Sequence, residues 1–147
     1  MKKLRFVFQG CNKITDEGLD DFCEGLKQLS LLEDLSLSLM HQLSKITDKG
    51  VHWLDNCIKR LPGLKSLELN FGFCNGISAV RVEGLSNRLK NLRKLESFSL
   101  GFSDCGQMTD SGLHNLCKRL KSLNGSLKSL SLNFYKGDMT DVGLKFI

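Results

Sequence analysis

Six cysteines and three histidines are the residues of this 147-residue sequence whose types could do chemistry. Cysteine pairs form disulfides, Cys/His groups bind zinc, and a Cys or Ser beside a His can act as a nucleophile. The histidines, His41, His52 and His114, show no metal-ligand spacing with the cysteines. The sequence also contains no evident Ser/His/Asp or Cys/His set and no phosphate-binding glycine loop. We therefore expect a protein that is not an enzyme and that has no metal and no cofactor.

The elements that position these residues follow from an internal repeat. Three apolar residues at alternate positions, a pattern typical of a strand, occur five times. The copies begin at Leu4, Leu35, Leu67, Phe98 and Leu130, at intervals of 31 or 32 residues. A second motif follows each copy, as in Ile14-Thr15-Asp16-Glu17-Gly18. Two independent markers that keep one period indicate five repeats of one structural unit.

Each repeat also predicts a helix. Counted from the Ile or Met of the second motif, apolar residues fall at +5, +8, +12 and +15; in the first repeat these are Leu19, Phe22, Leu26 and Leu29. Steps of three and four place them on one stripe of a helix of about 14 residues. The preceding Thr or Ser can cap free backbone N–H groups, and the Asp after it suits the positive end of the helix dipole.

These units must stack, because a lone strand and helix cannot bury both apolar faces. Strands then form a parallel sheet and helices a second layer. Strands lie about 4.8 Å apart whereas helices need about 8–10 Å, so the array must curve with the sheet inside. The expected fold class is α/β: a curved right-handed solenoid of about five strand–helix repeats, with the parallel sheet concave and the helices convex.

The pattern Leu32-x-x-Leu35-x-Leu37, followed by an Ile-Thr-Asp-x-Gly helix start, resembles a leucine-rich repeat. It is most similar to the long, ribonuclease-inhibitor-like subfamily, which includes the Ran GTPase-activating proteins. We expect one domain over 1–147, with repeats at about 4–34, 35–66, 67–97, 98–129 and a partial 130–147. The period exceeds the usual 20–29 residues, and the third repeat has Ser78-Ala79-Val80-Arg81 in place of Thr-Asp-x-Gly.

The repeat frame argues against a disulfide network. Cys11, Cys74 and Cys105 occupy one position, three residues after the last strand marker. In leucine-rich repeats this site turns inward and hydrogen-bonds loop backbone. The other three cysteines, Cys23, Cys57 and Cys117, lie at the flanks of the helical stripes. We expect all six to be buried thiols in a reducing, cytoplasmic setting, although neighbouring repeats could bring Cys74 and Cys105 close enough to bond.

The net charge is +5, so the positions of the basic residues bear on what the protein binds. Position +13 is lysine in four repeats: Lys27, Lys59, Lys90 and Lys121. Cations there offset the negative end of the helix dipole; alternatively, they form a basic ridge for an acidic protein or a phosphate-bearing surface. Interleaved aromatics are missing, which argues against nucleic acid, and the short apolar stretches argue against a membrane.

Residues at the remaining strand positions should point away from the core and form three rows on the concave face. The first row is Arg5, Ser36, Glu68, Ser99 and Ser131; the second is Val7, Ser38, Asn70, Gly101 and Asn133; the third is Gln9, Met40, Gly72, Ser103 and Tyr135. This face either accepts a closely fitting segment of a partner or is solvated. Trp53, at +7, either packs on a neighbouring helix or makes an outer contact.

The sequence thus predicts an intracellular, non-catalytic module that binds a protein of unknown identity through its concave face. The alternative is a scaffold or spacer segment of a large assembly that makes contacts through its helix side or its ends. A role as a GTPase regulator rests only on analogy with the Ran GTPase-activating proteins. The chain opens on a strand and stops within an expected helix, at Ile147, so we expect further repeats or a capping partner at both ends.

Overall fold

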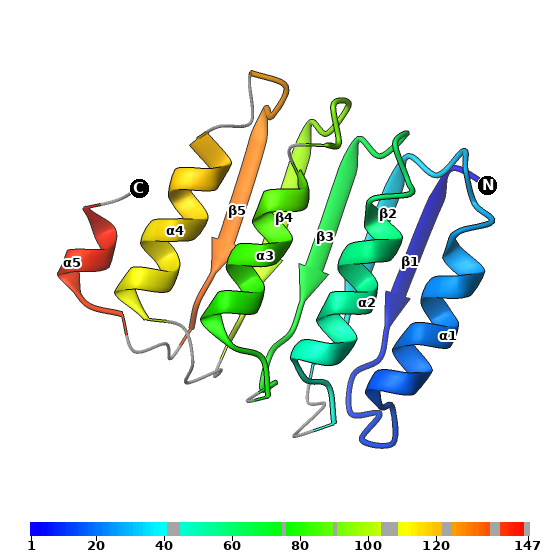
Figure 1. Cartoon of the computed structure of the whole chain (residues 1–147), viewed down its shortest axis with the longest axis horizontal. Helices are drawn as coiled ribbons and strands as arrows, with labels where there is room; N and C mark the ends of the chain where they lie inside the picture. The colour runs from blue at the N-terminus through cyan, green and yellow to red at the C-terminus, as the bar shows by residue number, and fades with distance from the viewer. Residues whose placement is uncertain are drawn as a thin grey trace.

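The structure, a computed structural model, describes residues 1–40, 45–74, 76–89, 91–103, 109–121, 125–135 and 139–145. Strands and helices alternate along the chain (Figure 1). The strands are β1 (Lys3–Val7), β2 (Asp34–Ser38), β3 (Ser66–Asn70), β4 (Ser97–Gly101) and β5 (Ser129–Asn133). The helices are α1 (Asp16–Leu26), α2 (Asp48–Ile58), α3 (Ala79–Leu89), α4 (Asp110–Lys121) and α5 (Asp141–Leu144).

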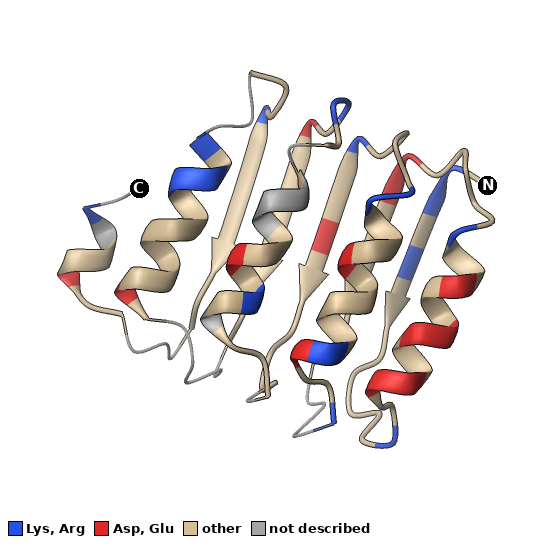
Figure 2. Ribbon diagram, viewed as in Figure 1, with Lys and Arg blue, Asp and Glu red and all other residues tan. Residues whose placement is uncertain are grey.

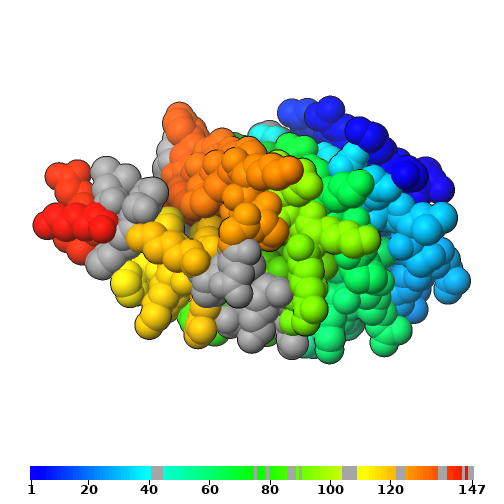
Figure 3. Space-filling view, turned by 90° about the horizontal axis from the view of Figure 1, so that it is seen from above, coloured from blue at the N-terminus to red at the C-terminus, as the bar shows by residue number. Residues whose placement is uncertain are grey.

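The five strands form one parallel sheet in the order β1-β2-β3-β4-β5, and the helices lie along one face of it (Figure 1). In the space-filling view, the colours pass in chain order from one end of the molecule to the other (Figure 3). Each unit therefore packs mainly on the units before and after it. Five parallel strands alternate with helices in an α/β arrangement, with leucines at matching positions, as the sequence predicts.

The core lies between the sheet and the helices. Strand residues such as Leu37, Leu69 and Leu100 are almost fully buried there, as are helix residues such as Leu54 and Leu85. The third apolar marker of each repeat lies just past its strand, yet in the first four repeats its N–H still bonds the next strand, as from Phe71 to the carbonyl of Gly101 at 2.8 Å. The ring of Phe71 stacks on that of Phe102, with centroids 5.3 Å apart.

The helices are shorter than the sequence predicts. The helices α1, α2 and α3 each have 11 residues and end at the +12 residue of the stripe. The +15 leucine instead belongs to a tight turn, in which the N–H of Leu29 bonds the carbonyl of Leu26 at 2.9 Å and that of Leu61 bonds Ile58 at 3.0 Å. The apolar stripe thus continues into a turn. The +15 leucine has to be buried, but it does not have to be part of the helix.

The aspartate of the helix-start motif joins one repeat to the next. Asp16 accepts hydrogen bonds from the N–H and the hydroxyl of Thr47, at 2.9 and 2.6 Å, and from the N–H of Gly50 at 3.0 Å. Asp48 accepts in the same way from Ser78, and Asp110 from Thr140. We call this arrangement the aspartate latch. The sequence interpretation assigned the aspartate only to its own helix dipole, whereas its partners lie in the following repeat.

The latch also explains the glycine of the motif. A Cβ built on Gly50 would overlap the carboxylate of Asp16, and one on Gly143 would meet that of Asp110. Gly18, in the first repeat, has nothing within 4 Å of a built Cβ. At Gly50 and Gly143 the glycine therefore leaves room for the aspartate of the preceding repeat, whereas the third repeat, which Asp48 latches through Ser78, has Arg81 at this position. In the third repeat the aspartate position is Ala79, which has no acceptor oxygen to offer the fourth repeat.

The cysteines agree only in part with the sequence interpretation. Cys74 turns inward, and its thiol lies 3.6 Å from the carbonyl of Leu39 in the preceding repeat. Cys23, Cys57 and Cys117 are buried free thiols, but Cys11 is exposed, which corrects the expectation of burial. Among the described residues, no strand precedes β1 to cover Cys11. Cys105 lies outside the described residues, and with it the expectation that neighbouring repeats bring it close enough to Cys74 to bond.

Candidate interaction surface

The face of the sheet opposite the helices carries the candidate surface. Strand pairing places Arg5 beside Ser36, Ser36 beside Glu68, Glu68 beside Ser99 and Ser99 beside Ser131. The second row is also in register, from Val7 through Ser38, Asn70 and Gly101 to Asn133. The alignment of both rows across all five strands is therefore confirmed. We call this surface the open face, and its first row the central row.

The central row is polar and accessible. Arg5, Glu68 and Ser131 are exposed, and the two serines between them are half-buried. The hydroxyl of Ser36 donates to Glu68 Oε2 at 2.7 Å, so one oxygen of an exposed carboxylate is already oriented. A shallow hollow of about 310 Å³ lies over β1, β2 and β3, and its polar lining comes from Lys3, Arg5, Asp34, Ser36, Ser66 and Glu68.

The second row departs from the expectation at Gly101, which is buried. A Cβ built on Gly101 would lie 3.0 Å from Asn70 Oδ1, so the Asn70 side chain lies against this glycine. Asn70 Oδ1 also accepts from the N–H of Gly72 at 3.1 Å, and Asn133 Oδ1 accepts from that of Tyr135 at 3.2 Å. The asparagines therefore hold the loops that follow their strands, in addition to lining the open face.

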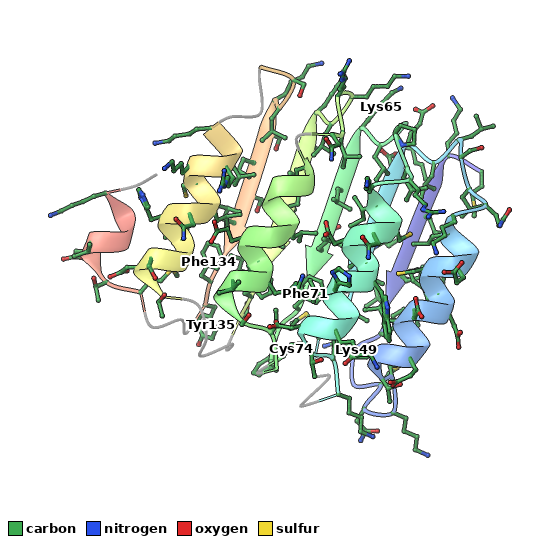
Figure 4. The ribbon with its side chains drawn as sticks, in the orientation of Figure 1. Lys49, Lys65, Phe71, Cys74, Phe134 and Tyr135 are labelled. Atoms are coloured by element: carbon green, nitrogen blue, oxygen red, sulfur yellow. The ribbon has the colours of Figure 1, made fainter. Side chains whose placement is uncertain are left out.

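The third expected row is not part of the sheet. Gln9, Met40, Gly72, Ser103 and Tyr135 all follow the ends of their strands. Gly72 and Ser103 are buried, Met40 is half-buried, and only Gln9 and Tyr135, at the two ends of the array, are exposed. The expectation that this row lines the binding face is wrong at Gly72 and Ser103, because the chain turns inward after each strand. In Figure 4, Phe71 and Cys74 mark this end of β3.

A row of alternating charges runs along the opposite ends of the strands, and the sequence interpretation missed it. Its members, in order across the sheet, are Lys2, Glu33, Lys65, Glu96 and Lys128 (Figure 2). Glu33 lies 2.7 Å from Lys2 and 2.8 Å from Lys65, and Lys128 lies 3.0 Å from Glu96. Hydrogen bonds from the two lysines lower the pKa of Glu33 to about 2. In the sequence, lysine and glutamate alternate at this position from one repeat to the next, and this pattern predicts the row.

The helix side holds the other candidate residues. A groove of about 470 Å³ is lined by Asp20, Cys23, Glu24, Lys27, Trp53, Asn56, Lys59 and Arg60, on α1 and α2 and just beyond their ends. Three of the candidates, Lys27, Lys59 and Trp53, thus line one groove. Trp53 is half-buried, lines this groove, and has Lys49 Nζ of its own helix 4.8 Å from its ring centre.

The lysines at +13 lie where the dipole argument places them. Lys27 and Lys59 are the C-terminal caps of α1 and α2, and Lys121 is the last residue of α4. Lys27 also pairs with Glu24. The fourth lysine, Lys90, lies outside the described residues. Lys27 and Lys59 therefore line the groove, whereas Lys121, on α4, lies two helices away from it.

Within the described ranges, no three His, Cys, Asp or Glu side chains are grouped so that they could hold a metal ion. In the same part of the chain, no helix is long and apolar enough to cross a membrane. The hydrogen bond with Cys57, together with burial, raises the pKa of the Cys23 thiol, which keeps this thiol protonated at neutral pH.

No protein-family model matches the chain, and no curated protein sequence matches it. One solved structure with a similar arrangement is the crystal structure of the Rad7 and Elc1 complex in yeast. The TM-score is 0.47 and the identity is 17%, over 90% of this chain. The chain spans 32% of the length of the yeast chain that it matches.

Proposed function

We propose that this chain is a non-catalytic protein-interaction module that binds a partner segment through the open face. The observation that carries this proposal is the unbroken five-strand register of the central row. It presents polar side chains at the spacing of adjacent strands, about 4.8 Å, on a face that no described helix covers. A rigid array of this kind can meet a partner with little loss of conformational entropy.

The chemistry of the open face favours a polar segment. Serine hydroxyls and asparagine amides both donate and accept hydrogen bonds, so they suit backbone and uncharged side chains. Arg5 is exposed at one edge of the sheet, where its guanidinium can donate two hydrogen bonds to a carboxylate. Glu68, in the middle of the sheet, can accept from a cation. The hollow over β1, β2 and β3 lies between these two charges. The partner segment we expect therefore carries an acidic residue and a basic residue separated by about two strand spacings, close to 10 Å.

The finer features of the fold belong to the same proposal. The difference between strand spacing and helix spacing supports a solenoid curved with the open face inside, and the chirality of parallel strand–helix–strand units supports a right-handed one. The helix-start motif supports membership of the ribonuclease-inhibitor-like subfamily, and the free thiols support a reducing, intracellular compartment. A concave face of this shape would surround a helix or loop of the partner.

A second function is favoured by the groove on the helix side. Trp53 and a cluster of cations are the kinds of residues that anchor interfaces. In this alternative the chain is a scaffold segment whose helix side makes the contact, and the open face is solvated. Any effect of this chain on a GTPase would then come from binding the GTPase, and not from catalysis by the chain.

Binding of a selected peptide distinguishes the two functions. Peptides that bind the native chain would be selected from a displayed library, and their affinities measured for three variants. We expect Ser99→Arg, in the middle of the open face, to weaken binding by about tenfold or more, because the new side chain fills the space above the central row. Glu68, its register neighbour, can pair with the new cation, so the fold should be kept.

The matched control is Gln28→Arg, which adds the same cation at an exposed position just after α1. It should leave binding unchanged. Trp53→Ala tests the helix side and should also leave it unchanged. Loss of binding with Trp53→Ala but not with Ser99→Arg would reject the open face and establish the groove.

A further inference from the structure

Two cysteines from neighbouring repeats meet between the helices α1 and α2. Cys23 is on α1 and Cys57 is on α2, and the two helices pack side by side (Figure 1). The two thiols are hydrogen-bonded to each other, although a whole repeat separates them in the sequence. Both side chains are buried, with exposed fractions of 1% and 0%. A pair of free thiols in contact therefore lies at the boundary between the first two repeats.

The surroundings of the pair make its two thiols chemically different. The hydrogen bond from the Cys23 thiol lowers the pKa of the Cys57 thiol. The cations Lys27 and Arg60 lower the same pKa, whereas burial and Glu24 oppose them. Cys57 is therefore the sulfur that loses its proton more easily, while Cys23 keeps its proton and donates it. In such a pair, one cysteine can attack an oxidant and the other can resolve the product to a disulfide.

The groove on the helix side gives a small oxidant a route to this pair. Cys23 is part of the lining of this groove, whose volume is about 470 Å³. Trp53, one helical turn before Cys57 on α2, also lines the groove, so the groove lies over the pair. A bulky thiol reagent needs more exposed sulfur than Cys23 offers. Hydrogen peroxide is little larger than water, and it is therefore the class of oxidant that this site suits.

We propose that Cys23 and Cys57 are a modification site at which hydrogen peroxide converts two thiols into a disulfide between α1 and α2. The Cys57 thiolate attacks one peroxide oxygen, the O–O bond breaks, and the leaving hydroxide takes up the proton that Cys57 released. The sulfur of Cys23 then attacks the sulfenic acid formed on Cys57, and the sulfenic hydroxyl leaves as water with the Cys23 proton. Two thiols are oxidised to one disulfide, and one peroxide is reduced to two waters.

The disulfide joins the first repeat to the second covalently, in addition to the packing and the aspartate latch that already hold them. Because the closed loop restricts the unfolded chain, the oxidised protein should unfold at a higher urea concentration than the reduced protein. Trp53 lines the same groove and is the only tryptophan, so its fluorescence can follow the reaction. The open face is not involved, so this inference stands or falls independently of the proposed function.

Peroxide treatment of the folded chain, followed by mass spectrometry, tests the proposal. A Cys11→Ser background prevents the exposed thiol from linking two molecules. After incubation with hydrogen peroxide under native conditions, the remaining thiols are alkylated in urea and the tryptic peptides are analysed without reduction. We expect a crosslink between the peptides that contain Cys23 and Cys57, and its loss on treatment with dithiothreitol. The urea midpoint should shift upward on oxidation and return on reduction.

Cys117→Ser is the matched control. Cys117 occupies in the fourth repeat the position that Cys23 occupies in the first, and burial raises the pKa of its thiol. Its removal should leave the yield of the crosslink unchanged. Cys57→Ala, which keeps an apolar side chain at the buried position, should leave Cys23 as a thiol that is alkylated in urea. Full alkylation of both cysteines after peroxide, a crosslink of Cys23 to another cysteine, or a crosslink that forms only in urea or only with Cys117 present would each overturn the proposal.

Discussion

Removing one latch aspartate should destabilise the chain far more than removing the equivalent Asp141, which makes no latch within the described part of the chain. Asp16 is 7% exposed and accepts three hydrogen bonds from the second repeat, at 2.6 to 3.0 Å. Asp16→Ala leaves the N–H groups of Thr47 and Gly50 without an acceptor. Asp141→Ala, at the same motif position in the fifth repeat, breaks no hydrogen bond that the described side chains make.

The size of the effect follows from the three bonds. A hydrogen bond to a charged group contributes about 1.5–3 kcal/mol. Taking the lower end for each of the three bonds, because the Thr47 hydroxyl can rotate toward water, gives a loss of about 4.5 kcal/mol in the free energy of unfolding. Asp141→Ala loses only the interaction with its own helix end, less than about 1 kcal/mol. Asp16→Asn keeps one acceptor oxygen for the two N–H groups and should lie between these values.

Urea unfolding at low protein concentration measures these losses. Trp53 is the only tryptophan and lies in α2, the helix that the Asp16 latch holds, so its fluorescence reports on this boundary. Circular dichroism reports on the whole array. Equal losses for Asp16→Ala and Asp141→Ala would refute the reasoning, because the aspartate would then act only on its own helix.

Three further predictions follow from other contacts. Gly50→Ala should destabilise the chain although alanine favours helices, because its Cβ overlaps Asp16, and urea unfolding should show the loss disappearing in a Gly50→Ala/Asp16→Ala double variant. Glu33, with its pKa lowered from 4.5 to about 2, stabilises the folded chain above pH 4.5, and this contribution disappears as the pH falls toward 2. Glu33→Gln should therefore be less stable than the native chain in urea at pH 7 and equal to it near pH 2, and an equal deficit at both would contradict the ion pairs. In a Cys105→Ser background, a thiol reagent should modify one cysteine rapidly, Cys11, and the buried cysteines only after unfolding; mass spectrometry of the labelled peptides identifies the site.

Much of the fold was predictable because each repeat is specified by local patterns. The apolar alternation in Leu35-x-Leu37-x-Leu39 fixes which side of the strand is buried, and an equal period in every repeat fixes the register. The helix ends were less predictable, because a buried leucine such as Leu61 satisfies the apolar stripe equally well from a turn as from a helix. The burial of Gly101 depends on the side chain of Asn70 in another strand, which no local pattern describes.

The aspartate latch shows why a correct motif can still be assigned the wrong partner. Asp16 at a helix start suits its own dipole, and that local explanation needs no second repeat. Its actual hydrogen bonds join residues 31 and 34 positions apart. No sequence correlation signals these partners, because Asp48 bonds Ser78 although Arg81 stands at the motif-glycine position of that repeat.

The central claim is that the open face binds a polar partner segment, and competition at the central row tests it most directly. A peptide selected on the native chain would be titrated calorimetrically against the native chain and against Ser99→Arg, Gln28→Arg and Trp53→Ala. We expect binding to be lost only with Ser99→Arg, and the peptide's acidic residue to crosslink near Arg5. Undiminished binding to a folded Ser99→Arg variant would contradict it.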